Sequence, residues 1–414
     1  MPSMVSEYTN VADALRLVLA RVRKRRSIEF IPALRSYGRV LSSDVAAPKD
    51  VPSASTSHMD GYAVISGDLR GATPSRPVAL NVIDATGPGR RSKLVLKGGD
   101  AIQVATGAML PAGADAVVPV ESAEVEGREV RVKHAVGPEE HVYRAGQDMR
   151  RGELILQSGH RIRAQDVGIL VALGLRTIGV RRMPRVALMA TGSELTPASR
   201  PRKGKTVESH SLVFLRLAEA LGCRGLALGP VRDDPHELLA ALRGALARSD
   251  FVVTLGGTSA GERDLVVSTV SSLRPDVLVH GLKLDRGRVT GLASVRGKPI
   301  LMLPGPIQAA ANAFLIVGVP IIGELSGSRE TGLTVPCVLG APWEARKRFS
   351  DFQKVAYVKL KPGAQAVAEP IAGETESMKM LSEADGYFVV PQDVSRLEAG
   401  DRVEVRLVPG FSFS

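Results

Sequence analysis

FVVTLGGTSAGERD, residues 251–264, is the stretch that decides the fold class. Its first five residues are apolar or β-branched, and a short run of this kind bounded by turn residues predicts a buried strand. The strand runs directly into three glycines, Gly256, Gly257 and Gly261. Glycine adopts positive φ without strain, so we expect a tight turn that leads into a helix. A buried strand, a tight turn and a helix are the repeating unit of a parallel α/β sheet.

The same turn predicts an anion-binding site. Successive backbone N–H groups in a glycine-rich loop form a cradle for an anion, and a following helix N-terminus adds a favourable dipole. Asp264 at its end indicates that a divalent cation or a proton transfer accompanies a phosphate-bearing ligand. The alternative interpretation is a tight surface turn without a ligand. The residues expected to form the cradle are Gly256, Gly257, Thr258, Ser259 and Gly261.

Strands and helices alternate on both sides of this stretch, from about residue 185 to residue 328. The predicted strands are Val186–Ala190, Leu226–Leu228, Phe251–Leu255, Val277–Val279 and Ile300–Leu303. Alternation of this kind predicts a mostly parallel sheet covered by helices on both faces. Ligands on such sheets bind beyond the carboxyl ends of the strands, where Thr191-Gly192-Ser193-Glu194 and Asp233 also fall.

The rest of the chain predicts three further units, so the fold class is a multidomain α/β protein with two small β-domains. We predict a discontinuous N-terminal domain formed by residues 1–50 and 143–182. An inserted β-domain over residues 51–142 interrupts it. The α/β domain is assigned to residues 183–330, and a C-terminal β-barrel or sandwich to residues 331–414.

Composition narrows the function classes for this chain of 414 residues. Its formal net charge of +11 is spread along the sequence and aromatic residues make up only 4%, so we expect no nucleic-acid partner. Cys223 and Cys337 lie at no metal-ligand spacing. The most apolar segment, residues 311–325, contains Pro320 and is expected to be too short to cross a membrane. We therefore expect a cytoplasmic protein without a membrane partner.

Two adjacent acids receive different roles. Asp234 precedes proline at a predicted helix start, with glutamate three residues on, and is expected to cap that helix. Asp233 lies just outside the helix at a strand end, so it is the expected functional acid. Glu194 occupies a corresponding position, although a first-turn helix acid is the alternative interpretation. Asp60 and Thr106 lie in turn-rich segments, where the Thr106 hydroxyl is a candidate donor to an anion.

Together these segments resemble the molybdopterin molybdenumtransferase family, which includes the bacterial MoeA proteins and the gephyrin E domain. The resemblance covers nearly the whole chain in the family's order. The matching stretches are Asp50-Val51-Pro52 with residues 57–64, 106–118, Gly146-Gln147-Asp148 with Arg151-Gly152-Glu153, and residues 191–195, 231–235 and 256–264.

The resemblance implies an elongated homodimer with its active site between subunits. It also implies insertion of molybdate into adenylylated molybdopterin with Mg2+, releasing AMP and molybdenum cofactor. A molybdopterin adenylyltransferase and apo-molybdoenzymes are the implied partners.

By position, the implied catalytic residues are Asp60, Glu194, Asp233 and Asp264, with Asp233 and Asp264 at the metal. Asp264→Ala is expected to abolish metal insertion and leave the fold intact, because a loop-tip acid contributes little to packing. Gly257→Val is expected to block the approach of the ligand. The implied substrate-binding residues are Thr106, Gly107, Gly256, Gly257, Thr258, Ser259, Gly261, Arg286, Arg288, Lys354 and Ser377.

Two stretches depart from the family pattern where molybdate is expected to bind. Asp285-Arg286-Gly287-Arg288-Val289 replaces Lys-Pro-Gly-Lys-Pro, and Pro304-Gly305-Pro306-Ile307-Gln308-Ala309 replaces Pro-Gly-Asn-Pro-Val-Ser. Lys354 stands where the family has an arginine. Arg286, Arg288 or Lys283 could supply compensating charge, although arginine and lysine are not equivalent at such sites. The leading hypothesis is a molybdenumtransferase, and its rival is a non-catalytic paralogue that binds molybdopterin or its adenylate as a carrier or assembly partner.

Overall fold

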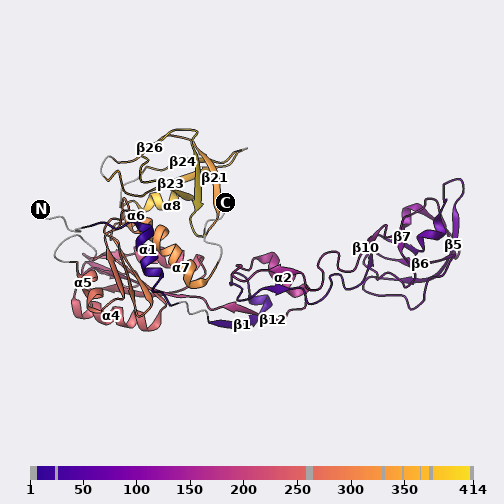
Figure 1. Ribbon diagram of the computed structural model, residues 1–414, viewed down its shortest axis with the longest axis horizontal. Helices are drawn as coiled ribbons and strands as arrows, with labels where there is room; N and C mark the ends of the chain where they lie inside the picture. The colour runs from indigo at the N-terminus through magenta and orange to yellow at the C-terminus, as the bar shows by residue number, and fades with distance from the viewer. Residues whose placement is uncertain are drawn as a thin grey trace.

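Four domains follow one another along an elongated molecule (Figure 1). The computed structural model describes residues 7–23, 27–257, 264–328, 332–346, 349–363, 365–372 and 376–410. The α/β domain and the C-terminal domain form one end, the inserted β-domain forms the other, and the discontinuous domain lies between them. The predicted fold class is confirmed.

The α/β domain is built on a six-stranded sheet with the strand order β16-β13-β17-β20-β19-β18. β16, β13, β17 and β20 run parallel, and β19 and β18 complete the sheet as antiparallel strands. β17 is buried along its whole length, as its apolar run predicts. The strands are β13 (Arg185–Thr191), β16 (Arg224–Val231), β17 (Phe251–Leu255), β18 (Val277–His280), β19 (Gly291–Val295) and β20 (Lys298–Leu303).

Helices cover both faces of this sheet. α3 (His210–Ala220), α6 (Ile307–Ala313) and α7 (Val319–Ser326) pack with Val186 and Leu188 of β13 on one face. On the other face, α4 (Pro235–Arg248) and α5 (Leu265–Ser272) pack with Ala187 and Met189. The alternation of buried side chains along β13 thus supplies both cores.

The first helix, α1 (Val11–Leu19), belongs to the α/β core and not to the discontinuous domain in which residues 1–50 were placed. Its buried side chains Val11, Ala14 and Val18 share the core of α3 and α6. An apolar helix face does not by itself identify the surface that covers it, so the sequence could not assign this helix to its domain.

Pro320 does not break the apolar segment as expected. Ile307–Ser326 forms 20 continuous helical residues, which is long enough to cross a membrane. Pro320 lies in the first turn of α7, directly after the π-helical stretch η4 (Phe314–Gly318), where its missing N–H is tolerated. Because 78% of its most apolar window is buried inside the protein, the segment is a core helix.

The discontinuous domain joins two distant stretches of chain. β1 (Ile28–Pro32) pairs antiparallel with β12 (Thr177–Arg181), and β2 (Val45–Ala46) pairs with β11 (Leu154–Leu156). The short helix η1 (Ala33–Arg35) and α2 (Ala164–Ala172) complete it around a small core that includes Leu41, Ile162 and Leu170.

The inserted domain is a six-stranded sheet with the order β7-β4-β6-β5-β9-β8. A short pair, β3 (Thr56–Ser57) and β10 (Val142–Tyr143), lies where the chain enters and leaves it. Its other elements are β4 (Gly61–Val64), η2 (Ser66–Leu69), β5 (Val78–Thr86), β6 (Asp100–Val104), β7 (Ala116–Pro119), η3 (Val120–Ser122), β8 (Ala123–Glu126) and β9 (Glu129–Val132).

The C-terminal domain is a closed five-stranded barrel with the order β21-β24-β23-β25-β27. Of the two expected architectures, barrel and sandwich, the structure has the barrel. Its elements are β21 (Thr334–Leu339), β22 (Trp343–Glu344), β23 (Lys354–Lys361), β24 (Val367–Pro370), α8 (Met378–Glu383), β25 (Gly386–Val390), β26 (Arg396–Leu397) and β27 (Arg402–Leu407).

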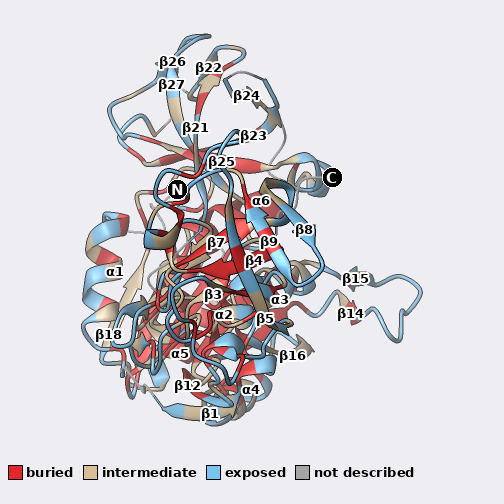
Figure 2. Ribbon diagram, turned by 90° about the vertical axis from the view of Figure 1, so that its right-hand side faces the viewer, coloured by how far each residue is buried: buried red, intermediate tan, exposed pale blue. Residues whose placement is uncertain are grey.

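A narrow arm projects from the α/β domain after β13 (Figure 2). It consists of β14 (Leu195–Pro197) and β15 (Thr206–Glu208), which pair in parallel, and an exposed loop between them. The loop carries Arg200, Arg202, Lys203 and Lys205, so the arm presents positive charge to solvent.

Candidate active site

A cleft of about 1160 Å3 opens at the carboxyl ends of β13, β17 and β20. The chain passes from β13 to β16 on one side and returns to β17 on the other, so the cleft lies at the point where strand order reverses. Its lining residues are Ala190, Thr191, Gly192, Glu194, Leu195, Thr206, Val207, Glu208, Ser209, His210, Asp233, Leu255, Gly256, Gly257, Leu265, Arg288, Val289, Pro304, Gly305, Pro306 and Glu376.

Asp233 is held in the cleft by a reciprocal pair of hydrogen bonds with Ser193. The Ser193 N–H donates to Asp233 Oδ2 at 2.9 Å, and the Asp233 N–H donates to Ser193 Oγ at 3.1 Å. These bonds fix the loop after β13 to the loop after β16, which brings Glu194 and Asp233 into one wall of the cleft. Both carboxylates remain exposed to solvent.

Asp234 caps α4, as predicted. Its Oδ1 accepts hydrogen bonds from the N–H groups of His236 and Glu237, each at 2.9 Å. The two adjacent acids therefore have separate duties, because Asp234 is committed to the helix and Asp233 faces the cleft.

Gly256 and Gly257 line the cleft with φ of +87° and +67°. A Cβ on Gly257 would lie 2.5 Å from Val266 Cγ2 and 2.7 Å from Thr191 Oγ1. The expected reason for glycine was access for a ligand, but these contacts show that glycine is already required by the protein's own packing. The remaining predicted cradle residues, Thr258, Ser259 and Gly261, lie outside the described residues.

Asp264 is not a loop-tip acid. It caps α5 by accepting a hydrogen bond from the Val267 N–H at 3.2 Å, and its Oδ2 lies 3.2 Å from His280 Nε2 without hydrogen-bond alignment. Burial raises the pKa of this carboxyl, against the lowering effects of the Val267 N–H and of His280. Its side chain is 15% exposed and does not line the cleft, so the expectation that it contributes little to the fold was wrong.

Thr191 presents a buried hydroxyl to the cleft. Among the described residues, its Oγ1 has no hydrogen-bond partner, and its neighbour is the glycine turn at Gly257. A buried, unpartnered hydroxyl is costly, so it is a natural hydrogen-bonding group for a ligand.

The two stretches that depart from the family pattern contact each other. Arg286 Nη1 donates to Gln308 Oε1, and the Asn312 side-chain amide donates to the carbonyls of Asp285 and Arg286 at 3.2 and 3.0 Å. Tyr357 in turn donates to Asn312 Oδ1 at 2.9 Å. Arg288 lines the cleft, with its guanidinium 4.9 Å from the centre of the Phe349 ring. Arg288 is therefore the predicted cation that reaches the cleft.

Lys354 and Ser377 have structural roles in the C-terminal domain. Lys354 is buried, and its Nζ donates to the carbonyls of Ser350, Gln392 and Val394 at 2.7, 2.8 and 3.2 Å. Ser377 caps α8 by accepting from the Met380 N–H at 3.1 Å. The three carbonyls engage the three donors of the ammonium, and neither side chain lines the cleft. Lys283 is likewise engaged, at 3.2 Å from Asp351 Oδ2.

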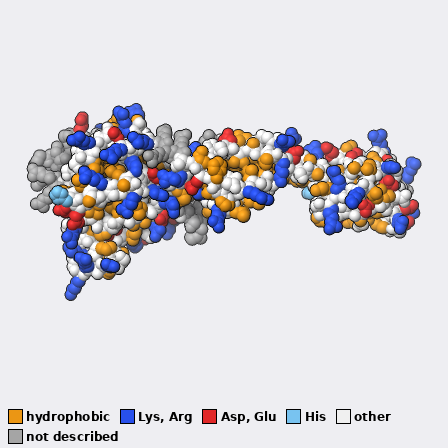
Figure 3. All heavy atoms as spheres, turned by 90° about the horizontal axis from the view of Figure 1, so that it is seen from below, with side chains coloured by type: hydrophobic (Ala, Val, Ile, Leu, Met, Phe, Trp, Pro, Cys, Tyr) orange, Lys and Arg blue, Asp and Glu red, His pale blue; other side chains and the backbone are white. Residues whose placement is uncertain are grey.

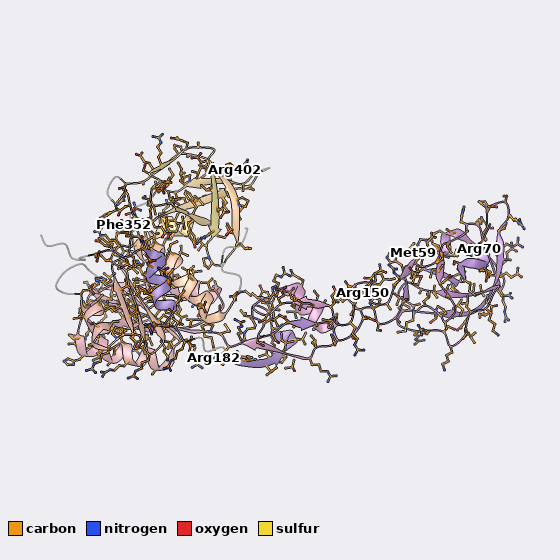
Figure 4. All side chains as sticks on the ribbon, in the orientation of Figure 1. Met59, Arg70, Arg150, Arg182, Phe352 and Arg402 are labelled. Carbon is orange, nitrogen blue, oxygen red and sulfur yellow. The ribbon has the colours of Figure 1, made fainter. Side chains whose placement is uncertain are left out.

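Asp60, Thr106 and Gly107 lie in the inserted domain, separated from the cleft of the same chain by the discontinuous domain. Met59, which precedes Asp60, marks their place in Figure 4. The N–H and hydroxyl of Thr106 donate to Asp60 Oδ1 at 2.6 and 2.9 Å. The backbone N–H of Thr106, and then its hydroxyl, lower the pKa of Asp60. The predicted anion donor Thr106 therefore donates to the Asp60 carboxylate of its own chain.

Sequence reasoning missed one wall of the cleft, formed by Glu208, Ser209 and His210 where β15 passes into α3. Glu208 accepts from the Ser211 N–H at 2.7 Å and from its hydroxyl at 2.6 Å. Serine directly before the apolar helical pattern is a start signal that could have located this helix end. Glu376, from the C-terminal domain, is a second omission for which the sequence offers no local signal.

Comparisons with known proteins match every domain. Residues 9–174 match the family described as MoeA N-terminal region (domain I and II), residues 187–324 match the probable molybdopterin binding domain, and residues 336–408 match the MoeA C-terminal region (domain IV).

Full-length relatives agree with these matches. The chain is 30% identical to molybdopterin molybdenumtransferase 2 of Mycobacterium tuberculosis, with 96% of this chain and 98% of the relative covered. It is also 30% identical to the molybdopterin molybdenumtransferase of Bacillus subtilis, with 96% and 94% covered. A crystal structure of a molybdopterin biosynthesis MoeA protein from Pyrococcus horikoshii is 29% identical, covers 98% of this chain and 100% of its own, and superposes with a TM-score of 0.83.

Proposed function

Because this chain belongs to the MoeA family of molybdopterin molybdenumtransferases, we propose that its cleft inserts molybdate into adenylylated molybdopterin and releases AMP. It is an enzyme of molybdenum cofactor biosynthesis, and the comparisons with known proteins give no support to the non-catalytic alternative. The observation that carries the proposal is the convergence of Glu194, Asp233 and the Gly256-Gly257 turn at the carboxyl ends of β13, β16 and β17.

The phosphate-bearing part of the substrate is assigned to the wall formed by Thr191 and the glycine turn. The Thr191 hydroxyl is buried and has no partner among the described residues, so a phosphate oxygen would satisfy it. The positive φ of Gly256 and Gly257 gives this turn a curvature that most side chains do not permit.

Glu194 and Asp233 are suited to hold Mg2+. Both are exposed carboxylates on one wall, and a bound Mg2+ takes one or two carboxylates and keeps several waters. Among the described residues there is no cluster of three or more acids, histidines or cysteines, which agrees with a metal that relies on substrate oxygens. Bound there, the ion would neutralise charge on the phosphate. Asp264 fits this role less well, because its carboxylate caps α5 and faces His280.

The molybdate oxyanion is assigned to the side of the cleft that Arg288 lines. Arg288 is exposed, and stacking on Phe349 fixes the plane of its guanidinium. Lys205 on the arm donates to the carbonyl of Ser193, the residue before Glu194 of the cleft, at 2.9 Å. These cations stand in for the lysines of the family pattern.

A second copy of this chain completes the site. Asp60 and Thr106 cannot reach the cleft of their own chain without crossing the discontinuous domain. That domain exposes large apolar side chains, which gather over the middle of the molecule in Figure 3. Ile28, Phe30, Leu34 and Tyr37 are 56%, 76%, 75% and 70% exposed. Such a patch is typical of an interface, and a symmetric dimer would place the inserted domain of one copy near the cleft of the other.

We assign the reaction to the cytoplasm. A molybdopterin adenylyltransferase would supply the substrate, and apo-molybdoenzymes would accept the product.

The decisive experiment combines the purified protein with adenylylated molybdopterin, Mg2+ and molybdate, and follows AMP release and reconstitution of an apo-molybdoenzyme. We expect turnover that requires both the metal and molybdate. Tight binding of the adenylate without AMP release would overturn the proposal in favour of a carrier.

The shared site is tested by mixing inactive subunits. Asp60→Asn and Asp233→Asn homodimers are each expected to be inactive, while unfolding and refolding them together should restore about a quarter of the wild-type activity, because half of the dimers are mixed and each has one intact site. No recovery would contradict a site built from two chains.

A further inference from the structure

A second groove lies at the opposite edge of the central sheet, where the parallel strands begin. Its volume is about 610 Å3, and its walls are the last turns of α4 and α5 and the turn between β19 and β20. We name it the basic groove. Its lining residues are Arg243, Leu246, Ala247, Ser272, Leu273, Arg274, Val295, Arg296 and Lys298.

The charge of this groove is one-sided. Four of its lining residues are arginine or lysine, and no lining residue is aspartate or glutamate. Two acids close to the groove have structural roles: Asp276 Oδ2 accepts from the Gly297 N–H at 3.3 Å, and Asp250, which lines a neighbouring pocket with Arg296 and Lys298, pairs with Arg182 at 2.9 Å. Figure 3 shows Lys and Arg side chains spread over this end of the molecule with few Asp and Glu between them. The groove is thus a site of positive potential.

Two of these arginines occupy backbone positions that favour glycine or asparagine. Arg296 has φ of +53° and is followed by Gly297 at +76°, in the two-residue turn that joins Val295 to Lys298. Turns of this kind strongly prefer Asn-Gly. Arg274 also has φ of +53°, directly after the Leu273 cap of α5, where glycine is the usual residue.

Local stability therefore does not explain these arginines. A non-glycine residue in the left-handed region is held at some cost, and two such residues line one groove. Both side chains are exposed, so packing does not explain them either. A ligand that pairs with both guanidinium groups would account for both residues.

The floor of the groove is apolar, and this distinguishes between the kinds of anionic ligand that could bind there. Leu246 and Leu273 pack against the core between α4, α5 and the sheet, and Val295 is part of it. An apolar floor between cations matches a chain segment that alternates carboxylates with aliphatic side chains. Nucleic acid would leave this floor unused, and the groove offers no aromatic side chain for stacking.

We propose that the basic groove docks an acidic, partly aliphatic segment of a partner protein. The groove lies at the amino-terminal edge of the sheet and the candidate active site at the carboxyl-terminal edge. A partner bound there would leave the cleft at the opposite edge uncovered, because the two sites share no lining residue. This inference does not depend on the reaction proposed above.

The test uses the full-length chain and a fluorescein-labelled peptide in which glutamates alternate with leucines. Binding is measured by anisotropy for the wild type and for the double variant Arg274→Gly/Arg296→Asn. Because both replacements suit left-handed backbone, the variant should melt at the same temperature or higher, which excludes misfolding as the cause of any loss. We expect binding to weaken about tenfold or more.

Two controls define the result. Arg70→Asn removes an exposed arginine with ordinary φ from the inserted domain and should leave the affinity unchanged. A peptide with glutamine in place of glutamate should not bind. Equal affinity of the double variant and the wild type would overturn the proposal. So would tighter binding of a single-stranded oligonucleotide than of the acidic peptide at the same salt, because it would assign the groove to nucleic acid.

Discussion

Two pairs of left-handed backbone positions, one pair at each edge of the central sheet, differ in the residues that occupy them. At the carboxyl-terminal edge, Gly256 and Gly257 occupy such positions, and a Cβ would contact Thr191 or Val266 too closely. At the amino-terminal edge, Arg274 and Arg296 occupy them with exposed side chains. The glycines are required by close packing at a ligand-binding turn, whereas the arginines are tolerated in open surroundings for what their side chains do.

Gly257→Val should have the largest effect on stability, because its Cβ would meet Val266 and Thr191 at 2.5 and 2.7 Å and φ is +67°. We expect a loss of about 3 kcal/mol in the free energy of unfolding, measured by urea denaturation. Gly305→Ala is the matched control in the same cleft, since its Cβ would meet only Gly256 Cα at 4.0 Å. An unchanged urea midpoint for Gly257→Val would show that close packing does not require glycine at this position.

Asp233→Asn should lower the rate of AMP release about 100-fold with little change in stability, because the carboxylate is exposed and charged at the cleft. The control is Asp234→Asn, which preserves the cap of α4 and should retain activity. If the two variants lose activity equally, the separation of roles between these neighbours is wrong.

Asp264→Ala should lower the free energy of unfolding by about 1 kcal/mol through loss of the α5 cap. Asp264→Asn keeps a capping oxygen and should restore that stability. Unfolding curves for both variants, set beside their AMP release rates, separate capping from catalysis. Equal stability of the alanine variant and the wild type would show that the cap contributes nothing.

Arg296→Asn should have the smallest effect and the opposite sign. Asparagine suits the first position of this turn, so we expect a gain of about 0.5 kcal/mol in the free energy of unfolding. Thermal melts of this variant and of Arg128→Asn, an exposed arginine in the inserted domain, provide the measurement and its control. A loss of stability would mean that the Arg296 side chain supports the fold.

The sequence predicted best those features whose cause is local. The β17 strand, the α4 cap at Asp234 and the parallel sheet follow from apolar runs, turn residues and capping patterns. Strand β19 was not predicted. It forms a hairpin with β20 through the turn Arg296-Gly297, and the usual sequence signal for such a turn is Asn-Gly, which this chain lacks there. The sequence assigned residues 1–50 to the discontinuous domain, whereas helix α1 packs in the α/β core, because an apolar helix face does not identify its partner.

Side-chain roles that depend on distant residues could not be predicted. Lys354 has the sequence surroundings of an ordinary strand lysine, and only the fold brings the carbonyls of Gln392 and Val394 to its ammonium beside that of Ser350. The basic groove is a similar case. Its four cations come from three separate segments, so a charge that looks dispersed along the chain is gathered in space.

The contact between Arg286 and Gln308 changes how the family departures are to be counted. Two replacements that look independent in the sequence meet as donor and acceptor, beside the amide of Asn312 that braces the same loop. Reverting either residue alone would remove this hydrogen bond, so the mutational effects of the two positions should be non-additive. The two departures therefore amount to one coupled change in this chain and not to two independent ones.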